Sequence, residues 1–487
     1  MRFIKVLLLS LVLLVFATPS FQYGLKIFNE TPLKGFYHKY PPPSLDSLTP
    51  SGWFSSRFQD AFTQHLNDHT GLRNTLIRIS NQADYSLFGI IHAEGFIRGK
   101  QGYLYEEDYI HEYTGEYFIG QAAIDKKLLR LKDVIDSLRA RHVTLLLVYE
   151  PGKASFYPEH IPLRFHPEKR SLTNYEYMTR RSAELGIGFL DMNRYFLLMK
   201  DTARFPLFPK YGMHWSLFGV PYAVDTVARA IEHETGVALP RFSSGRYIRS
   251  GIPMGSDNDI GELLNVVCPL HPTQGGFPQV TFAKSPPAPL KVLAIADSYY
   301  LNIITAYGRK MFASQDYWYY NKKVFPYQNN NPPLYVDKSN LREKLENYNL
   351  VLLMISEINL HCGFWNFADE AYAAFHPGLR EPLVWGIEND IRNDREWFRF
   401  MVRKARIQHR PLEEMIREDA WYTFYTNYNE LKGKSYWDSV YHITFDIKNN
   451  AEWYAQVVKK AADRKIPVDS MLLLDAVYCY GQSKNKH

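Results

Sequence analysis

The sequence predicts an α/β protein in which a parallel sheet is flanked by helices, with a helical module at the C-terminal end. Two observations support this. Short apolar runs of strand length alternate with amphipathic helical segments through the middle of the chain, and the C-terminal part contains an internal repeat. Strands separated by helices form parallel sheets, because each helix crosses back over a face of the sheet. Active sites in such sheets lie at the carboxyl ends of the strands.

The individual elements follow from the spacing of apolar residues. Between residues 124 and 138 these residues recur every three or four positions, as on one face of a helix. Residues 143–149 form a continuous apolar run, as expected for a strand buried on both faces. The same reasoning predicts further strands at 187–191, 292–296 and 350–355, helices at 174–185 and 219–234, a helical stretch at 55–88, and a hairpin at 97–105.

The N-terminus indicates export. Arg2 and Lys5 precede an apolar run from residue 6 to 17, and Ala17-Thr-Pro-Ser20 breaks that run. Apolar character continues to residue 28 without a clean cleavage site, which favours an uncleaved membrane anchor over a removed signal peptide. The predicted organisation is a signal peptide or anchor at 1–28, a linker at 29–52, the sheet domain at 53–380 and the helical module at 381–487.

The C-terminal module contains an internal sequence repeat. Two segments 56 residues apart share one sequence motif, Asp390-Ile-Arg-Asn-Asp-Arg-Glu-Trp397 and Asp446-Ile-Lys-Asn-Asn-Ala-Glu-Trp453. The match continues in register to Asp419-Ala420 and Asp475-Ala476. The sequence therefore predicts a duplicated helical unit.

Composition excludes some classes of function. The net charge is +6, but no long Lys/Arg run marks a nucleic-acid surface. No Walker or dinucleotide glycine pattern occurs, so no cofactor is expected, and His65 with His69 lacks an evident third metal ligand. The three cysteines allow at most one disulfide, for which Cys268 and Cys362 are a possible pair. The 15% aromatic content fits either large cores or a sugar-binding surface.

Ser298 is the candidate nucleophile. The apolar strand predicted at 292–296 runs directly into Asp297-Ser298 and then into a turn. That arrangement presents the serine hydroxyl at the carboxyl edge of the sheet, with backbone amides of the next helix directed at an oxyanion. Asp297 has the alternative role of a helix cap.

His214 is the candidate general base. It lies in Tyr211-Gly-Met-His-Trp-Ser216, in a loop before a predicted helix. Imidazole titrates near neutral pH and can take the proton of a serine hydroxyl. A structural histidine fits the same position equally well.

Seven short sequence motifs, in order along the chain, carry a resemblance to a known protein family. The motifs are Asn67-Asp-His-Thr-Gly-Leu-Arg73, Leu87-Phe-Gly89, Gly99-Lys-Gln-Gly-Tyr-Leu-Tyr105, Lys153-Ala-Ser-Phe-Tyr-Pro-Glu159, His214-Trp-Ser216, Asp297-Ser298 and Glu357-Ile-Asn-Leu360. Between residues 53 and 360 the chain resembles the SGNH hydrolase-like acetyltransferase domain of the alginate O-acetyltransferase family, in which the His also precedes the Ser.

The resemblance implies an SGNH-like sheet and an O-acetyltransferase that acts on an extracytoplasmic polysaccharide through an acyl-serine intermediate. It implies location in the periplasm, here with the N-terminal segment anchored in the inner membrane. It further implies a polysaccharide acceptor and a membrane-bound O-acyltransferase as the source of acetyl groups. A carbohydrate esterase of the same fold and a non-catalytic polysaccharide-binding or assembly subunit are the alternatives.

One departure from the family pattern leaves the third catalytic group open. The family places an Asp two residues before the His, and this chain has Gly212 there. Another acid orients His214, or Ser298 and His214 act as a pair, or the site is weak or inactive. Glu150, Asp191 and Glu357 lie at predicted strand ends and are the candidate carboxylates.

Overall fold

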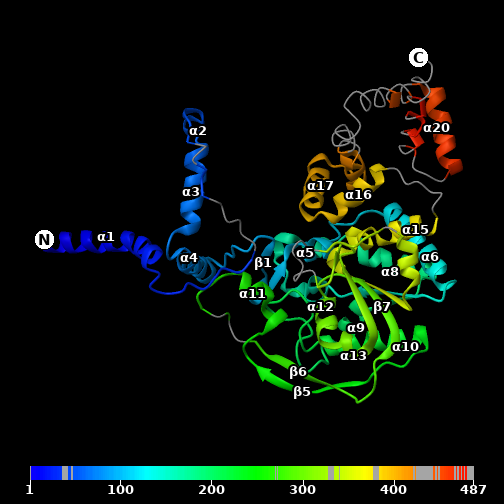
Figure 1. Cartoon of the computed structure of the whole chain (residues 1–487), viewed down its shortest axis with the longest axis horizontal. Coiled ribbons are helices and arrows are strands. Elements are labelled where there is room, and N and C mark those ends of the chain that lie inside the picture. The colour runs from blue at the N-terminus through cyan, green and yellow to red at the C-terminus, as the bar shows by residue number, and fades with distance from the viewer. Residues whose placement is uncertain are drawn as a thin grey trace.

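The computed structural model describes residues 2–35, 42–44, 48–268, 270, 273–326, 334–338, 340–376, 383–420, 423, 443–444, 447, 450–464, 468, 471–472, 474–476 and 478–479. Its centre is a six-stranded sheet in the order β4-β3-β10-β7-β8-β9. Figure 1 shows helices around the labelled strand β7 of this sheet. The first five strands in this order are parallel, and β9 pairs antiparallel with β8 at the edge. The strands are β3 (Thr144–Glu150), β4 (Phe189–Asp191), β7 (Ala288–Ala296), β8 (Phe312–Tyr319), β9 (Lys323–Val324) and β10 (Leu350–Ser356).

Helices cover both faces of the sheet, as the sequence predicted. Alternate side chains of β3, β7 and β10 enter two separate hydrophobic cores, one on each face. Because both faces are covered, these three strands are almost entirely apolar. One core includes α6 (Gln121–Arg139), α8 (Asn174–Glu184) and α15 (Phe367–Phe375), and the other includes α9 (Met192–Met199), α10 (Val220–Thr235) and α12 (Tyr300–Ile303).

All four predicted strands are present, and the hairpin predicted at 97–105 is formed by β1 (Phe96–Arg98) and β2 (Leu104–Glu106). Four strands were not predicted. These are β8, β9 and the two strands of an antiparallel hairpin, β5 (Phe242–Ser250) and β6 (Gly275–Phe282). The disulfide between Cys268 and Cys362 is absent, since all three cysteines are free, Cys268 exposed and Cys362 buried.

The N-terminal segment forms one long helix, α1 (Arg2–Leu25), which by length and composition alone could cross a membrane. The helix continues through Pro19, so the segment at 17–20 that interrupts the apolar run does not end the helix. The helical stretch predicted at 55–88 is divided into α3 (Arg57–His69) and α4 (Arg73–Phe88), after a short α2 (Pro50–Phe54). At the division, a β-carbon on Gly71 would lie 2.2 Å from the Pro19 carbonyl oxygen, so glycine permits the contact with α1.

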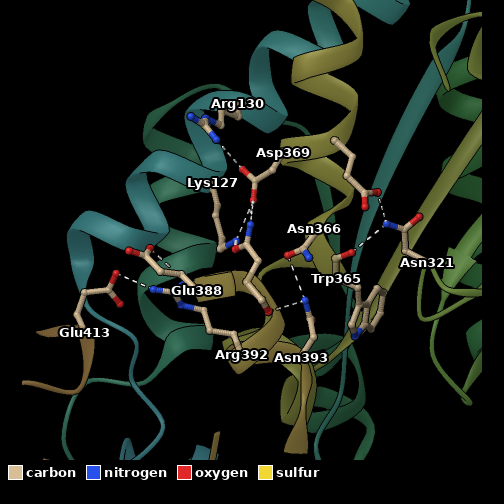
Figure 2. A network of polar contacts seen from close by, with 12 residues as sticks. Lys127, Arg130, Asn321, Trp365, Asn366, Asp369, Glu388, Arg392, Asn393 and Glu413 are labelled. Carbon is tan, nitrogen blue, oxygen red and sulfur yellow. Dashed lines mark hydrogen bonds and ion pairs between the residues drawn. The ribbon is translucent and has the colours of Figure 1, made fainter. Parts of the chain in front are cut away.

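The C-terminal module begins with α16 (Leu383–Asn393) and α17 (Arg395–Gln408) and includes α20 (Ala451–Arg464). A buried polar network joins it to the sheet domain, and Figure 2 shows its side chains. Lys127 of α6 donates hydrogen bonds to Asp369 of α15 at 3.0 Å and to Asn389 of α16 at 2.9 Å. Arg392 of α16, 2% exposed, pairs with Glu413 at 2.7 Å. Side chains of α16 and α17 also enter the core under α6.

The two copies of the predicted repeat make equivalent contacts where both are described. Asp394 caps the N-terminus of α17 through the Trp397 amide, and Asn450 makes the same contact with Trp453. Lys404 pairs with Asp419, and Lys460 pairs with Asp475. Part of the second copy, including residues 446 and 448–449, lies outside the described residues. The division of the chain at residue 381 stays a prediction.

Candidate active site

Ser298 lies at the carboxyl edge of the sheet, two residues after the end of β7. β7 is paired with β10 on one side and with β8 on the other, so this point is central in the sheet. The preceding Asp297 is fully buried, and its Oδ2 accepts hydrogen bonds from the Ser356 amide, the Ser356 hydroxyl and Asn359. Asp297 therefore joins the ends of β7 and β10 and fixes the turn that presents Ser298.

His214 lies against Ser298, as the sequence predicted for a catalytic pair. Its Nε2 is 2.8 Å from the Ser298 hydroxyl oxygen. Its Nδ1 is 2.7 Å from Oδ2 of Asp259. The neutral tautomer that satisfies both contacts donates from Nδ1 to Asp259 and accepts the Ser298 proton at Nε2. The three side chains form a continuous chain of hydrogen bonds of the type that activates a serine hydroxyl.

Asp259 was not predicted from the sequence. It begins the short helix α11 (Asp259–Leu263), and its Oδ1 accepts the Met213 amide at 2.9 Å and the Ile260 amide at 2.7 Å. The Tyr211 carbonyl in turn accepts the amides of Ile260 and Gly261. One carboxylate oxygen of Asp259 is thus held by the amides of Met213 and Ile260, which directs the other oxygen toward Nδ1.

Gly212 cannot take the role that the family gives to its Asp, and the structure shows why. A β-carbon at Gly212 would lie 2.2 Å from the Ser256 carbonyl oxygen and 2.7 Å from the Pro209 ring. The loop that carries Asp259 therefore occupies the space that a side chain at position 212 would need. The acid reaches His214 from this loop instead of from the histidine's own segment.

Two of the three carboxylates proposed from strand ends, Asp191 and Glu357, are hydrogen-bonded to other groups. Asp191 caps α9 through the Arg194 amide and accepts the Tyr175 hydroxyl. Glu357 accepts the Ser155 hydroxyl at 2.5 Å, and burial is the main cause that raises its pKa to about 7. Glu150 is fully buried, and burial followed by the charge of Asp297 raises its pKa well above the usual range. The expectation that one of them orients His214 is corrected, because Asp259 occupies Nδ1.

Aromatic packing holds the imidazole in place. The Tyr299 ring is edge-on to the His214 ring at 5.0 Å and edge-on to buried Trp215 at the same distance. The Tyr299 hydroxyl donates to the Met213 carbonyl at 3.2 Å and contacts the Tyr109 hydroxyl at 3.0 Å. Ring contacts and hydrogen bonds together restrict rotation of the histidine side chain.

Lys153 supports the segment that leads to His214. Its side chain is fully buried, and Nζ donates to the Gly212 carbonyl at 2.6 Å and to the Lys210 carbonyl at 3.1 Å. Burial lowers the pKa of Lys153 to about 7, against the opposing charges of Asp259 and Asp257. Lys153, the first residue of the motif at 153–159, therefore has a structural role beside the site.

The donors to an oxyanion differ from those expected. The amides of Tyr299 and Tyr300 are bonded to Asp297, to its side chain and its carbonyl respectively, and do not face an open site. Within the described ranges, the Ser298 amide has no hydrogen-bond acceptor. The Ser298 amide is therefore the backbone group left to donate to an oxyanion at this turn.

Comparison with protein families identifies part of the chain. Residues 96–279 match the family described as "SGNH hydrolase-like domain, acetyltransferase AlgX". This range includes His214 and Asp259 and ends before Ser298. Among curated proteins, the chain is 25% identical over 195 residues to "Probable alginate O-acetylase AlgJ" of Pseudomonas aeruginosa. The aligned part is 39% of this chain and 46% of that protein, so the chain spans less than half the length of this relative.

Two solved structures align with the chain at low sequence identity. The O-acetyltransferase domain of Pseudomonas putida AlgJ aligns with 55% of this chain and 92% of that chain, at 16% identity and a TM-score of 0.36. Pseudomonas aeruginosa AlgX aligns with 57% of this chain and 65% of that chain, at 12% identity and a TM-score of 0.39. The resemblance predicted from the sequence is confirmed: residues 96–279 match the SGNH hydrolase-like acetyltransferase domain family.

Proposed function

We propose that the chain is an O-acetyltransferase that acts on an extracytoplasmic polysaccharide through an acetyl-Ser298 intermediate. The observation that carries the proposal is the chain of hydrogen bonds from Ser298 through His214 to Asp259 at the carboxyl edge of the sheet. Acetyl transfer as the reaction of these three residues is supported by the family description that residues 96–279 match. The apolar helix α1 supports a position at the membrane.

The proposed reaction has two half-reactions. In the first, His214 Nε2 takes the Ser298 proton while the serine oxygen attacks the carbonyl carbon of the acetyl donor. The bond to the leaving group then breaks, and the leaving group takes the proton from His214. In the second, a sugar hydroxyl attacks acetyl-Ser298 and passes its proton to His214, and collapse of the intermediate returns that proton to Ser298. Asp259 stabilises the imidazolium at both stages. The donor in this proposal is an acetyl ester or thioester supplied by a membrane-bound O-acyltransferase.

Transfer is tested directly with a chromogenic acetyl ester, with and without an oligosaccharide acceptor. The expected result is release of the chromophore together with acetylated oligosaccharide, detected by mass spectrometry. Oligogalacturonate and a neutral cello-oligosaccharide are suitable acceptors to compare. Release of acetate alone, with every acceptor present, would identify an esterase. An inert protein under all these conditions would favour the non-catalytic polysaccharide-binding or assembly subunit.

The pH dependence of turnover is expected to report the pairing of His214 with Asp259. Burial alone would lower the pKa of His214, but the hydrogen bond and charge of Asp259 outweigh it, so the pKa lies above the ordinary value of 6.5. His214 must be neutral to accept a proton, so kcat/KM should fall as the pH falls through this raised pKa. Asp259→Asn removes the charge, so the midpoint of the residual activity should move to lower pH. An identical midpoint in both proteins would show that another group titrates.

A further inference from the structure

A row of large apolar side chains runs along α2 and α3, the two helices that follow the N-terminal helix. This apolar row consists of Trp53 and Phe54 of α2 and of Phe58, Phe62 and Leu66 of α3. The Phe58 ring lies 6.5 Å from the Trp53 ring and 6.2 Å from the Phe62 ring, measured between centroids. The rings therefore form one continuous strip from α2 into α3.

The apolar row is open to solvent. Phe54 is 88% exposed, and Trp53, Phe62 and Leu66 are each about half exposed. Every residue of α3 is at least partly exposed, so none of them belongs to a hydrophobic core. Soluble proteins rarely leave so many large apolar side chains together on their surface, and a patch of this kind marks a surface that contacts something else.

The two sides of α3 differ in character. Phe58, Phe62 and Leu66 follow one another at intervals of four residues, so they share one side of the helix. The opposite side carries three exposed polar residues, Asp60, Gln64 and Asn67. A helix with Phe, Trp and Leu on one side and polar residues on the other has the composition of helices that lie in the headgroup region of a membrane.

The turn between α3 and α4 is fixed to the end of α1. Gly71 in this turn packs on α1, where a β-carbon would lie 2.2 Å from the Pro19 carbonyl oxygen. The amides of Leu72 and Thr75 donate hydrogen bonds to the carboxylate of Glu30, at 2.8 Å and 3.0 Å. Because Glu30 closely follows α1 in the chain, both contacts hold the turn at the C-terminal end of α1.

This turn sets the position of α3 relative to a membrane that α1 crosses. Tyr23, exposed near the C-terminal end of α1, is of a residue type that is enriched at the headgroup level. Figure 1 shows α3 leaving the turn to one side of α1, not continuing its line. With 13 residues, α3 is about 20 Å long. It therefore runs along the surface from which α1 emerges.

We propose that α2 and α3 bind the surface of the lipid bilayer through the apolar row and lie in its headgroup region, beside the point where α1 leaves the membrane. The inference rests on the proposed function in one respect, namely that α1 is a membrane anchor. It adds a second membrane contact, which restricts how the sheet domain turns about that anchor. Lipid is favoured over a protein partner because the row adjoins the end of the anchor and is rich in Trp and Phe.

The test measures the depth of α3 in vesicles of phosphatidylethanolamine and phosphatidylglycerol that contain the full-length chain and no other protein. Cys268→Ser and Cys479→Ser leave only the buried Cys362. In this background, Phe62→Cys carries a fluorophore, and lipids with a nitroxide group near the headgroup quench it on contact. The label should lose most of its fluorescence, because the apolar side of such a helix lies about 5–10 Å into the headgroup–acyl boundary.

The matched control is Gln64→Cys with the same label. Gln64 is exposed on the opposite side of the same helix, so its label should lose little fluorescence. A second variant replaces Trp53, Phe54 and Phe58 by serine together in the Phe62→Cys chain. Quenching at position 62 should then fall, while α1 still holds the chain on the vesicles, as measured by flotation.

The outcomes separate the second membrane contact from the proposed function. Strong quenching at position 62 with little at position 64 supports the contact. Equal quenching at both positions, or none at either, in a chain that floats with the vesicles overturns it and leaves the α1 anchor standing. A label at position 62 that is unquenched in pure lipid but shielded in native membranes would assign the row to a protein partner and also overturns it.

Two further results concern the proposed function. A chain that does not float with the vesicles would contradict both the anchor and the second contact. Quenching confined to position 62, in a chain that transfers no acetyl group to any acceptor, would contradict the proposed function and leave the second contact standing.

Discussion

Ser298→Ala is expected to reduce acetyl-ester turnover by about 10⁴-fold or more, the largest effect of any single change in this chain. Among the residues that the structure describes, the nucleophilic oxygen in contact with His214 is that of Ser298. Alanine removes that atom and leaves the β7–β10 junction intact, because Asp297 makes the bonds that hold it. Turnover of a chromogenic ester and the thermal midpoint of unfolding are the two measurements needed.

The control for this substitution is Ser285→Ala, which removes an exposed hydroxyl shortly before β7. It should leave both turnover and the unfolding midpoint unchanged. If Ser298→Ala retained near-normal turnover while folding normally, the nucleophile would have to be another residue.

Asp259→Asn is expected to have the second largest effect, a loss of about 10⁴-fold in kcat with the protein still folded. Asparagine fills the same space but has no charge to stabilise the imidazolium. Its amide group can also hold the ring in the tautomer that carries the proton on Nε2, which cannot accept the serine proton. The measurement is kcat at a pH well above the pKa of His214, so that protonation of the imidazole does not obscure the result.

Asp191→Asn is the matched control, because the same change is made at another carboxylate that was a candidate from sequence. Asparagine caps helices as well as aspartate, so the α9 cap survives and turnover should stay near that of the wild type. A strong loss in Asp191→Asn, Glu150→Gln or Glu357→Gln, with little loss in Asp259→Asn, would return the orienting role to the strand-end carboxylates.

Local sequence patterns were sufficient for the centre of the fold. The strands β3, β7 and β10 are buried on both faces, so each is a continuous apolar run that stands out in the sequence. The missed strands lack this signal. β5 reads Phe-Ser-Ser-Gly-Arg-Tyr-Ile-Arg-Ser and is largely exposed, and β8 contains Ser-Gln-Asp in its middle, where the strand is also exposed. Their positions depend on pairing with distant segments, which spacing along the chain does not reveal.

The residues of the candidate site were also predictable only in part from the sequence. Ser298 and His214 could be proposed because each lies beside an element that has a strong pattern of its own. Asp259 could not, because it lies 45 residues after His214 in a polar turn that reads as the start of a short helix. One signal was present in the sequence. Gly212 stands where the family has its Asp, so the acid had to come from elsewhere. The segment Ser256-Asp-Asn-Asp259 offers two carboxylates between the histidine and the serine in the sequence. Contacts between segments far apart in the sequence, such as Ser256 against Gly212 and Met213 with Asp259, bring that turn to the imidazole.

The central claim is that Ser298 carries the acetyl group, and the most direct measurement is mass spectrometry of the intact chain and its peptides after rapid mixing with an acetyl ester. The account predicts one acetyl group, located on the peptide that contains Ser298, which disappears when an oligosaccharide acceptor is added and which never forms in Ser298→Ala. Acetylation of a different residue during turnover, or turnover by the Ser298→Ala protein with no adduct at all, would contradict it.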